Sequence, residues 1–147
     1  MDTLAELQAL ADKVVAIAKI QDYATLNTNA APTLADYTAA GITGVTSSNL
    51  NAVNARIDAA DIDRTSLIPV VVANGIKDHT DALDKIASYA DQGTTAPTVA
   101  DYAAAGVTGV TAENLTAVNA KVDAAVQATA NTTALIQSLA NAGATAY

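Results

Sequence analysis

An internal duplication constrains this chain of 147 residues more than any other feature of its sequence. Residues 32–60 and 97–125 align at an offset of 65 with 21 identities in 29 positions, and a weaker match at an offset of 66 continues upstream. Near-identical units of this length are typical of proteins that stack one small structural module. The sequence therefore predicts two tandem units, at residues 1–66 and 67–147, with a helical tail in the second unit from about Val126.

The first segment of each unit has the apolar spacing of an amphipathic helix. We expect one helix from about Thr3 to Ala24 and its counterpart from about Pro69 to Ala90. The run 69–72 alone would indicate a strand, but its alignment with the start of the first helix favours a helix. The apolar stripes expected to face the core comprise Leu7, Leu10, Val14, Ile17, Ile20 and Ala24 in the first helix, and Ala73, Ile76, Leu83, Ile86 and Ala90 in the second.

A short second helix follows in each unit, expected at residues 34–40 and 99–105. Thr33 is placed to cap its N-terminus, and Asp36 stands three residues later, where a carboxylate meets free backbone N–H groups. Gly41 follows the last turn, where glycine readily adopts the left-handed conformation that ends a helix. The second unit repeats this arrangement with Thr98, Asp101 and Gly106.

The third helix of each unit is expected to begin after a Thr-Gly-Val-Thr sequence. Thr46 is placed as its N-cap, and Val45 and Leu50 occupy the two positions of a hydrophobic staple. The second unit has Thr111, Val110 and Leu115 at the same places. Two endings remain open for this helix in the first unit: it stops between residues 61 and 66, or it continues into the second unit as one bent connector.

These helices predict an all-α fold of two tandem three-helix bundles. Each bundle is expected to consist of a long, a short and a long helix, in an elongated arrangement. The composition agrees, because 36 residues are Ala and the chain has no Phe or Trp. Small side chains favour helices that approach closely over a sandwich or a barrel.

The charge balance argues against several classes of partner. The net charge is −8, whereas phosphate binding needs clustered Lys and Arg, and anionic membrane surfaces repel an acidic chain. The longest apolar run, residues 67–73, is too short to span a membrane, and the N-terminus shows no signal peptide. We therefore expect no nucleic-acid partner and no membrane insertion.

One histidine and one cluster of aspartates are candidates for a metal or catalytic site. His79 is the only imidazole and aligns with Lys13, so we expect a solvent-exposed histidine without a function. Asp58, Asp61 and Asp63 form a small acidic cluster, but the glycine turn and closing Glu of a calcium-binding EF-hand loop are missing. A solvated helix end is favoured, and cation binding there stays open. One His and no Cys leave no metal triad and no Ser-His-Asp set.

Two further patterns have both a structural and a functional interpretation. Tyr37 and Tyr102 each follow an Asp, but adjacent helical positions point about 100° apart, which favours core tyrosines over an acid–phenol pair. The Thr-Gly-Val-Thr loops at 43–46 and 108–111 precede a helix as anion-binding loops do, yet they contain no Lys or Arg. The sequence therefore predicts no catalytic, cofactor-binding or metal-binding residue, and no enzyme.

Three motifs of the second unit carry a resemblance to a family. Ala-Pro-Thr-Val-Ala-Asp-Tyr (96–102), Ala-Gly-Val-Thr-Gly-Val-Thr (105–111) and Asn-Leu-Thr-Ala-Val-Asn-Ala (114–120) resemble repeat modules of very large bacterial surface or adhesin-like proteins. The resemblance covers most of the chain and implies an extracellular or cell-surface location. The helix order is also similar to that of albumin-binding modules of Gram-positive surface proteins. That likeness is one of layout, and no ligand-contact residue carries over.

Two functions from different classes fit these observations. The first is a non-enzymatic structural or spacer module, whose partners are neighbouring repeats of the same polypeptide. The alternative is a helical ligand-binding module that recognises a host or matrix protein. An exposed apolar or aromatic patch repeated in both units would distinguish the alternative, and the sequence offers none beyond its tyrosines.

Overall fold

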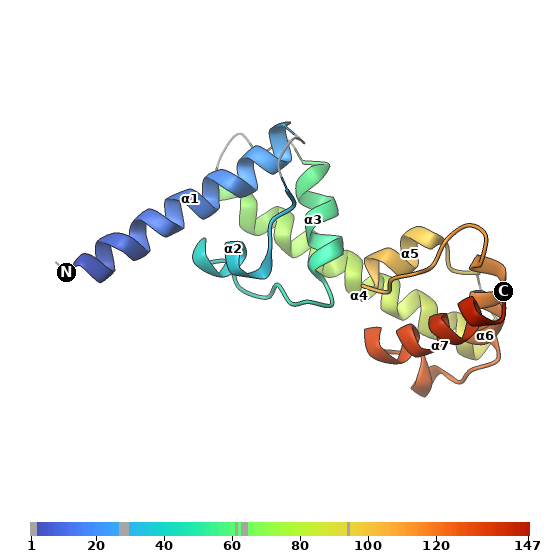
Figure 1. Ribbon diagram of the computed structural model, residues 1–147. Helices are drawn as coiled ribbons and strands as arrows, with labels where there is room; N and C mark the ends of the chain where they lie inside the picture. The colour runs from blue at the N-terminus through green and yellow to red at the C-terminus, as the bar shows by residue number, and fades with distance from the viewer. Residues whose placement is uncertain (1–2, 27–29, 61, 63–64, 94) are drawn as a thin grey trace. The chain divides into compact units, whose positions relative to one another are not determined.

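The computed structural model describes residues 3–26, 30–60, 62, 65–93 and 95–147, and the elements within these ranges are helical (Figure 1). The all-α expectation is confirmed for this part of the chain, and residues 69–72 are helical as expected. In chain order the α-helices are α1 (Leu4–Leu26), α2 (Leu34–Ala39), α3 (Leu50–Asp58), α4 (Ile68–Gln92), α5 (Val99–Ala104), α6 (Leu115–Asp123) and α7 (Thr133–Thr145). The short 3-10 turns η1 (Thr65–Leu67) and η2 (Gln127–Thr129) stand before α4 and α7.

The chain divides into two compact units, and the boundary lies between Ile76 and Lys77. This differs from the boundary expected after residue 66. Ile68 and Val72, at the start of α4, are almost completely buried in the core of the first unit, so α4 contributes residues to both units. Turn signals could not place this boundary, because it falls inside one helix.

The third helix of the first unit ends early. Helix α3 stops at Asp58, and the N–H of its C-cap residue Ala59 donates to the carbonyls of Ala55 and Ile57. The next α-helix begins only at Ile68, after η1. Helix α3 therefore does not continue into the second unit, which settles the question that the sequence left open.

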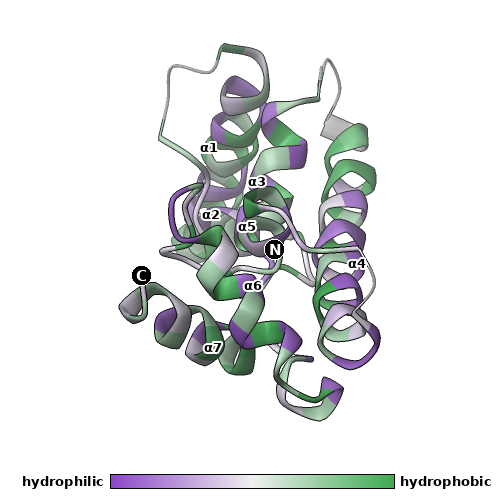
Figure 2. Ribbon diagram, turned by 90° about the vertical axis from the view of Figure 1, so that its right-hand side faces the viewer, coloured by the Kyte–Doolittle hydropathy of each residue, from purple (hydrophilic) through white to green (hydrophobic). Residues whose placement is uncertain are grey.

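The core of the first unit lies between α1, α2, α3 and the start of α4. Helix α1 contacts both α2 and α3. In Figure 2 the helices carry apolar and polar residues on alternating stretches, so each can bury one side. The largest fully buried side chains of this unit are Ile20, Pro32, Tyr37, Val53, Ile57, Ile68 and Val72.

The core of the second unit lies between the rest of α4, α5, α6 and α7. The segment expected as a tail contains η2 and α7, and α7 packs against α6 with Ile136 and Ala140 buried. Ile136 and Ala140 follow Ile68 and Val72 by 68 residues, so α7 plays in this unit the part that the start of α4 plays in the first. Four helical segments thus contribute to each unit, where three were expected in the first unit and three with a helical tail in the second.

One glycine in each unit permits a close contact between helices. A Cβ atom on Gly75 of α4 would lie 2.5 Å from Cα of Val53 in α3. A Cβ atom on Gly143 of α7 would lie 2.6 Å from Cα of Val118 in α6. Since such distances are shorter than any real carbon–carbon contact, a larger residue at either place must move a helix backbone.

The first half of α1 does not pack as the sequence predicted. Leu7, Leu10 and Val14 are 63%, 58% and 60% exposed, whereas Ile20 and Ala24 from the same expected stripe are buried. The buried residues of α1 all lie in its second half, the part that packs in the core. On α4, Ile86 and Ala90 are buried as expected, Ile76 and Leu83 are half-buried, and Ala73 is exposed. Periodicity indicates an apolar face, but not whether another element covers it.

The two short helices begin at the expected residues and each end one residue before the expected end, at Ala39 and Ala104. The Thr33 hydroxyl accepts from the backbone N–H of Asp36, whose carboxylate accepts from the backbone N–H of Thr33, which forms a capping box. Gly41 follows α2 with φ of 77°, the left-handed conformation that glycine adopts readily. The same geometry recurs in the second unit with Thr98, Asp101 and Gly106.

Candidate functional site

Each unit places a Lys–Asp ion pair on the capping box of its short helix. Nζ of Lys19, from α1, lies 2.6 Å from Oδ2 of Asp36, the oxygen that also accepts from Thr33. Partial burial favours the neutral acid, but the hydrogen bonds from Lys19 and Thr33 outweigh it and hold the pKa of Asp36 below its ordinary value of 3.8. The pair fastens α1 to the N-terminus of α2.

The second unit repeats this arrangement at the same distance. Nζ of Lys85 lies 2.6 Å from Oδ2 of Asp101, and the hydrogen bonds from Lys85 and Thr98 lower the pKa of Asp101 against the opposing effect of burial. Sequence analysis assigned the Asp residues to capping but missed both lysines. The available signal was that Lys19 and Lys85 are identical at equivalent places of the duplication.

A buried tyrosine in each unit is tied to an asparagine that sequence analysis also missed. The Tyr37 hydroxyl donates to Oδ1 of Asn54 at 2.6 Å, and Nδ2 of Asn54 donates to the carbonyl of Pro32 at 2.9 Å. Burial, together with the charges of Tyr23 and Asp36, raises the pKa of Tyr37. Asp36 and Tyr37 thus have different partners and form no acid–phenol pair.

The tyrosine of the second unit has the same surroundings. Tyr102 donates to Asn119 at 2.6 Å, and Asn119 donates to the carbonyl of Pro97 at 3.0 Å. Burial raises the pKa of Tyr102 as well. Each tyrosine is therefore a protonated hydrogen-bond donor that links the second helix, the third helix and the segment before the second helix.

The Thr-Gly-Val-Thr loop is closed by a buried asparagine. Oδ1 of Asn49 accepts from the N–H of Thr46 at 2.8 Å, and its Nδ2 donates to the carbonyl of Gly44 at 2.9 Å. The second unit repeats both bonds with Asn114, Thr111 and Gly109. The backbone N–H that an anion would need at Thr46 is already used.

These asparagines also correct the expected start of the third helix. Residues 47–49 and 112–114 form a turn, and α3 and α6 begin at Leu50 and Leu115 rather than directly after the threonine. The N-caps are Asn49 and Asn114, which make no side-chain capping bond to their own helix. Their side chains bond instead to loop residues three and five positions earlier.

His79 is not the exposed residue that the sequence predicted. It is 9% exposed, and its Nδ1 lies 2.9 Å from the carbonyl oxygen of Ala104. A carbonyl only accepts, so Nδ1 carries the proton in this bond. Ala104 is the last residue of α5, and the histidine therefore satisfies a carbonyl at a helix C-terminus.

The acidic cluster lies largely beyond the part that can be described. Asp61 and Asp63 are outside the described residues, and Asp58 is the last residue of α3. Within the described ranges, no group of three or more His, Cys, Asp or Glu side chains could hold a metal ion. The same part of the chain contains no helix long and apolar enough to cross a membrane.

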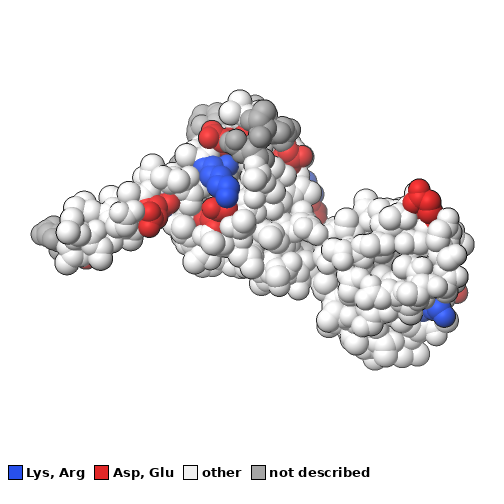
Figure 3. Space-filling view, in the orientation of Figure 1, with Lys and Arg blue, Asp and Glu red and all other residues white. Residues whose placement is uncertain are grey.

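The charged side chains do not gather into a basic patch on the face shown in Figure 3, where uncharged residues cover most of the described surface. The few Lys and Arg side chains visible there are accompanied by Asp or Glu in the same region. This distribution agrees with the acidic composition and offers no phosphate-binding surface on that face.

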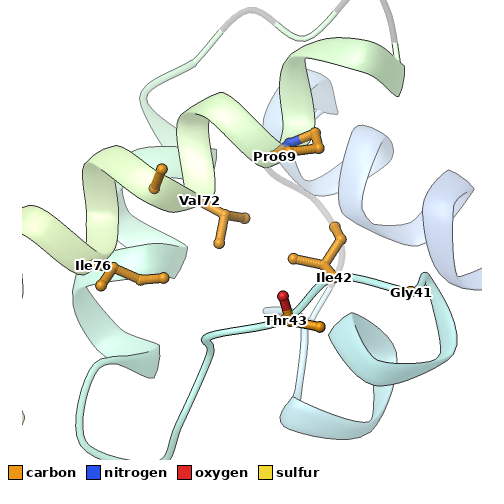
Figure 4. A pocket seen from close by; sticks show the side chains of 7 residues that line it. Gly41, Ile42, Thr43, Pro69, Val72 and Ile76 are labelled. Carbon is orange, nitrogen blue, oxygen red and sulfur yellow. The ribbon is translucent and has the colours of Figure 1, made fainter.

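The first unit contains a cavity beside the start of α4. A groove of about 260 Å³ opens between the loop after α2 and the start of α4, and in Figure 4 the side chains of Ile42, Thr43 and Val72 point toward one another across it. We call this the α4 groove. Its lining residues are Gly41, Ile42, Thr43, Pro69, Val72, Ala73 and Ile76. Sequence analysis gave no signal for it.

The equivalent place in the second unit is occupied by a glutamine. Gln137, which follows Pro69 by 68 residues, accepts from the backbone N–H of Thr108 at 2.8 Å and donates to the Thr108 carbonyl at 3.0 Å. Thr108 is the counterpart of Thr43 at the offset of 65. The two units therefore differ at this place, although their polar networks agree.

Comparison with protein-family models, with curated proteins and with solved structures yields no match to this chain.

Proposed function

We propose that the chain is a non-enzymatic structural spacer, made of two repeats of one helical module, from a bacterial cell-surface or secreted adhesin-like protein. The observation that carries this proposal is the recurrence of the same three polar networks in both units. The Lys–Asp pairs, the Tyr–Asn pairs and the loop asparagines have matching distances. Each network joins parts of its own unit, as residues kept for architecture do.

The module that we propose is a long helix, a short helix and a third helix, closed by a fourth segment. In the first unit the closing segment is the start of α4, and in the second it is α7. Gly75 and Gly143 support this equivalence, because each permits the same close contact with the third helix of its unit. A module whose closing segment opens the next module is suited to tandem repetition.

The surface location rests on the resemblance of the repeated motifs to bacterial surface proteins. The absence of an enzymatic role is proposed because the tyrosines, asparagines, lysines and aspartates singled out above all bond to groups of the scaffold. An acidic surface also agrees with a spacer, since net charge far from zero keeps a protein soluble.

Exposed apolar residues favour the alternative, a module that recognises a host or matrix protein. Leu4, Leu7, Leu10, Val14 and Val15 are each at least 58% exposed on the first half of α1. At the offset of 66 their counterparts are Val70, Ala73, Ile76, Thr80 and Asp81, which include polar residues. The patch is thus confined to one unit, whereas a repeated binding module would present it in both.

A three-unit chain tests the proposal. Residues 11 and 77 are equivalent at the offset of 66, so a second copy of residues 11–76 can be inserted after Ile76 within a helix. For a modular spacer we expect unchanged helicity per residue by circular dichroism and a larger maximum dimension by small-angle scattering. Loss of helicity or aggregation would contradict modularity. Saturable binding of albumin, fibronectin or collagen by the natural chain, abolished by Leu7→Gln with Leu10→Gln, would favour the alternative.

A further inference from the structure

At the offsets of 65 and 68, five of the seven residues that line the α4 groove differ from their counterparts in the second unit, and the exchange at Pro69 changes the hydrogen bonding of the loop. At the second position of α4 stands Pro69, which has no side-chain amide and is tolerated there because the first turn of a helix needs no N–H. At the equivalent place of the duplication, 68 residues later and within α7, stands Gln137, whose carboxamide pairs with both backbone groups of Thr108 and also donates to Oδ1 of Asn141. The second unit therefore shows that a carboxamide fits the backbone N–H and carbonyl of this loop residue, which we call the backbone edge of the loop.

The loop presents the same backbone edge in both units. Gly41 and Gly106 have φ of 77° and 76°, and Gly44 and Gly109 have φ of 87° and 78°, so the glycines on both sides of Thr43 and of Thr108 have matching conformations. Thr108 is satisfied by Gln137. Among the residues that the structure describes, none donates to or accepts from the backbone of Thr43.

The surroundings of this edge in the first unit are apolar. Ile42 is half-buried beside the groove, whereas its counterpart Val107 is 4% exposed in the second unit. Figure 4 shows Val72 of α4 on one side of the groove and the neighbouring loop residues Ile42 and Thr43 on the other. Thr43 itself is exposed beside these apolar walls, and a few polar groups next to apolar walls are what fixes the orientation of a ligand.

We propose that the α4 groove binds a glutamine side chain presented by another protein or peptide. The carboxamide oxygen accepts from the N–H of Thr43, the carboxamide nitrogen donates to the carbonyl of Thr43, and the methylene groups contact Ile42 and Val72. A carboxylate lacks the donor for this pairing, and a lysine lacks the acceptor. The inference is independent of the spacer function, since it rests on the difference between the units.

The test uses the full chain and a small probe that reproduces the glutamine side chain. Propanamide is titrated to high millimolar concentration while the backbone amide signals of Thr43 and Thr108 are followed by NMR. We expect a saturable shift at Thr43 and none at Thr108. The matched probes N,N-dimethylpropanamide, which has no N–H, and propanoate should give no saturable shift. Silence at Thr43, or an equal response to propanamide and its dimethyl form, would overturn the proposal.

Two variants locate the site. Pro69→Gln should supply the carboxamide from within, slow the hydrogen exchange of the Thr43 amide several-fold and abolish the response to propanamide. Gln137→Ala should free the backbone groups of Thr108, so that the Thr108 amide signal shifts with propanamide as that of Thr43 does. Circular dichroism checks that both variants are folded. A folded Pro69→Gln protein that keeps the full propanamide response would place binding elsewhere and refute the assignment.

Discussion

Two apolar helix segments at equivalent places of the duplication differ in burial: one is packed in a core and the other is exposed. The start of α4 buries Ile68 and Val72 against the first unit, whereas the first half of α1 leaves Leu7 and Leu10 more than half exposed. Both segments are helical and both are apolar on one side. The difference is that α3 packs against the start of α4. The comparison shows that an apolar stripe is necessary for a helix to join a core, but not sufficient.

The largest expected effect sharpens this comparison. Ile68→Ala and Ile136→Ala should each lower the free energy of unfolding of their unit by about 2–5 kcal/mol, because each removes a fully buried side chain and leaves a cavity. Leu7→Ala is the matched control on the uncovered segment, and its effect should stay within about 0.5 kcal/mol. Urea unfolding followed by circular dichroism measures all three. A cost for Leu7→Ala equal to that of Ile68→Ala would show that the start of α1 is covered in solution.

A second, smaller effect tests whether α7 and the start of α4 are equivalent. Gly75→Ala and Gly143→Ala should each destabilise their unit by about 1–3 kcal/mol, since the added Cβ lies against the backbone of the third helix. Ala142→Ser, on the exposed side of α7, serves as the control and should be nearly neutral. Hydrogen exchange resolves the two units. Were one glycine substitution costly and the other neutral, the equivalence of the closing segments would fail.

The smallest effect concerns the ion pairs and should be alike in both units. The folded-state pKa values of Asp36 and Asp101 lie below 3.8, so the unfolded chain binds more protons than the folded one in acid. Their stabilising contribution is therefore complete above about pH 5 and is lost as the pH falls through the folded-state pKa. Asp36→Asn and Asp101→Asn should each flatten the decline of stability between about pH 5 and pH 2, measured by urea unfolding at a series of pH values. An unchanged slope in either variant would mean that the lowered pKa of its aspartate contributes nothing to stability.

The sequence determined the local structure of this protein. Capping boxes at Thr33 and Thr98, left-handed glycines after the short helices and the helical state of residues 69–72 were all predictable, because each depends on residues within one turn of the chain. The duplication also made two units foreseeable. Among the networks, the identical Lys19 and Lys85 were an available signal, but their partners stand 17 and 16 residues away and no spacing rule connects them.

Only the tertiary structure decided which apolar faces are covered and where one unit ends. Burial of Ile68, exposure of Leu7 and the sheltered position of His79 depend on neighbours that are distant in sequence, and helical periodicity is the same in each case. The boundary inside α4 follows from that packing as well. The α4 groove could not be predicted from the sequence either, because it forms only where the loop at Thr43 lies beside Pro69 in the fold. Its difference from the second unit is seen only when Gln137 is found bonded to the equivalent loop.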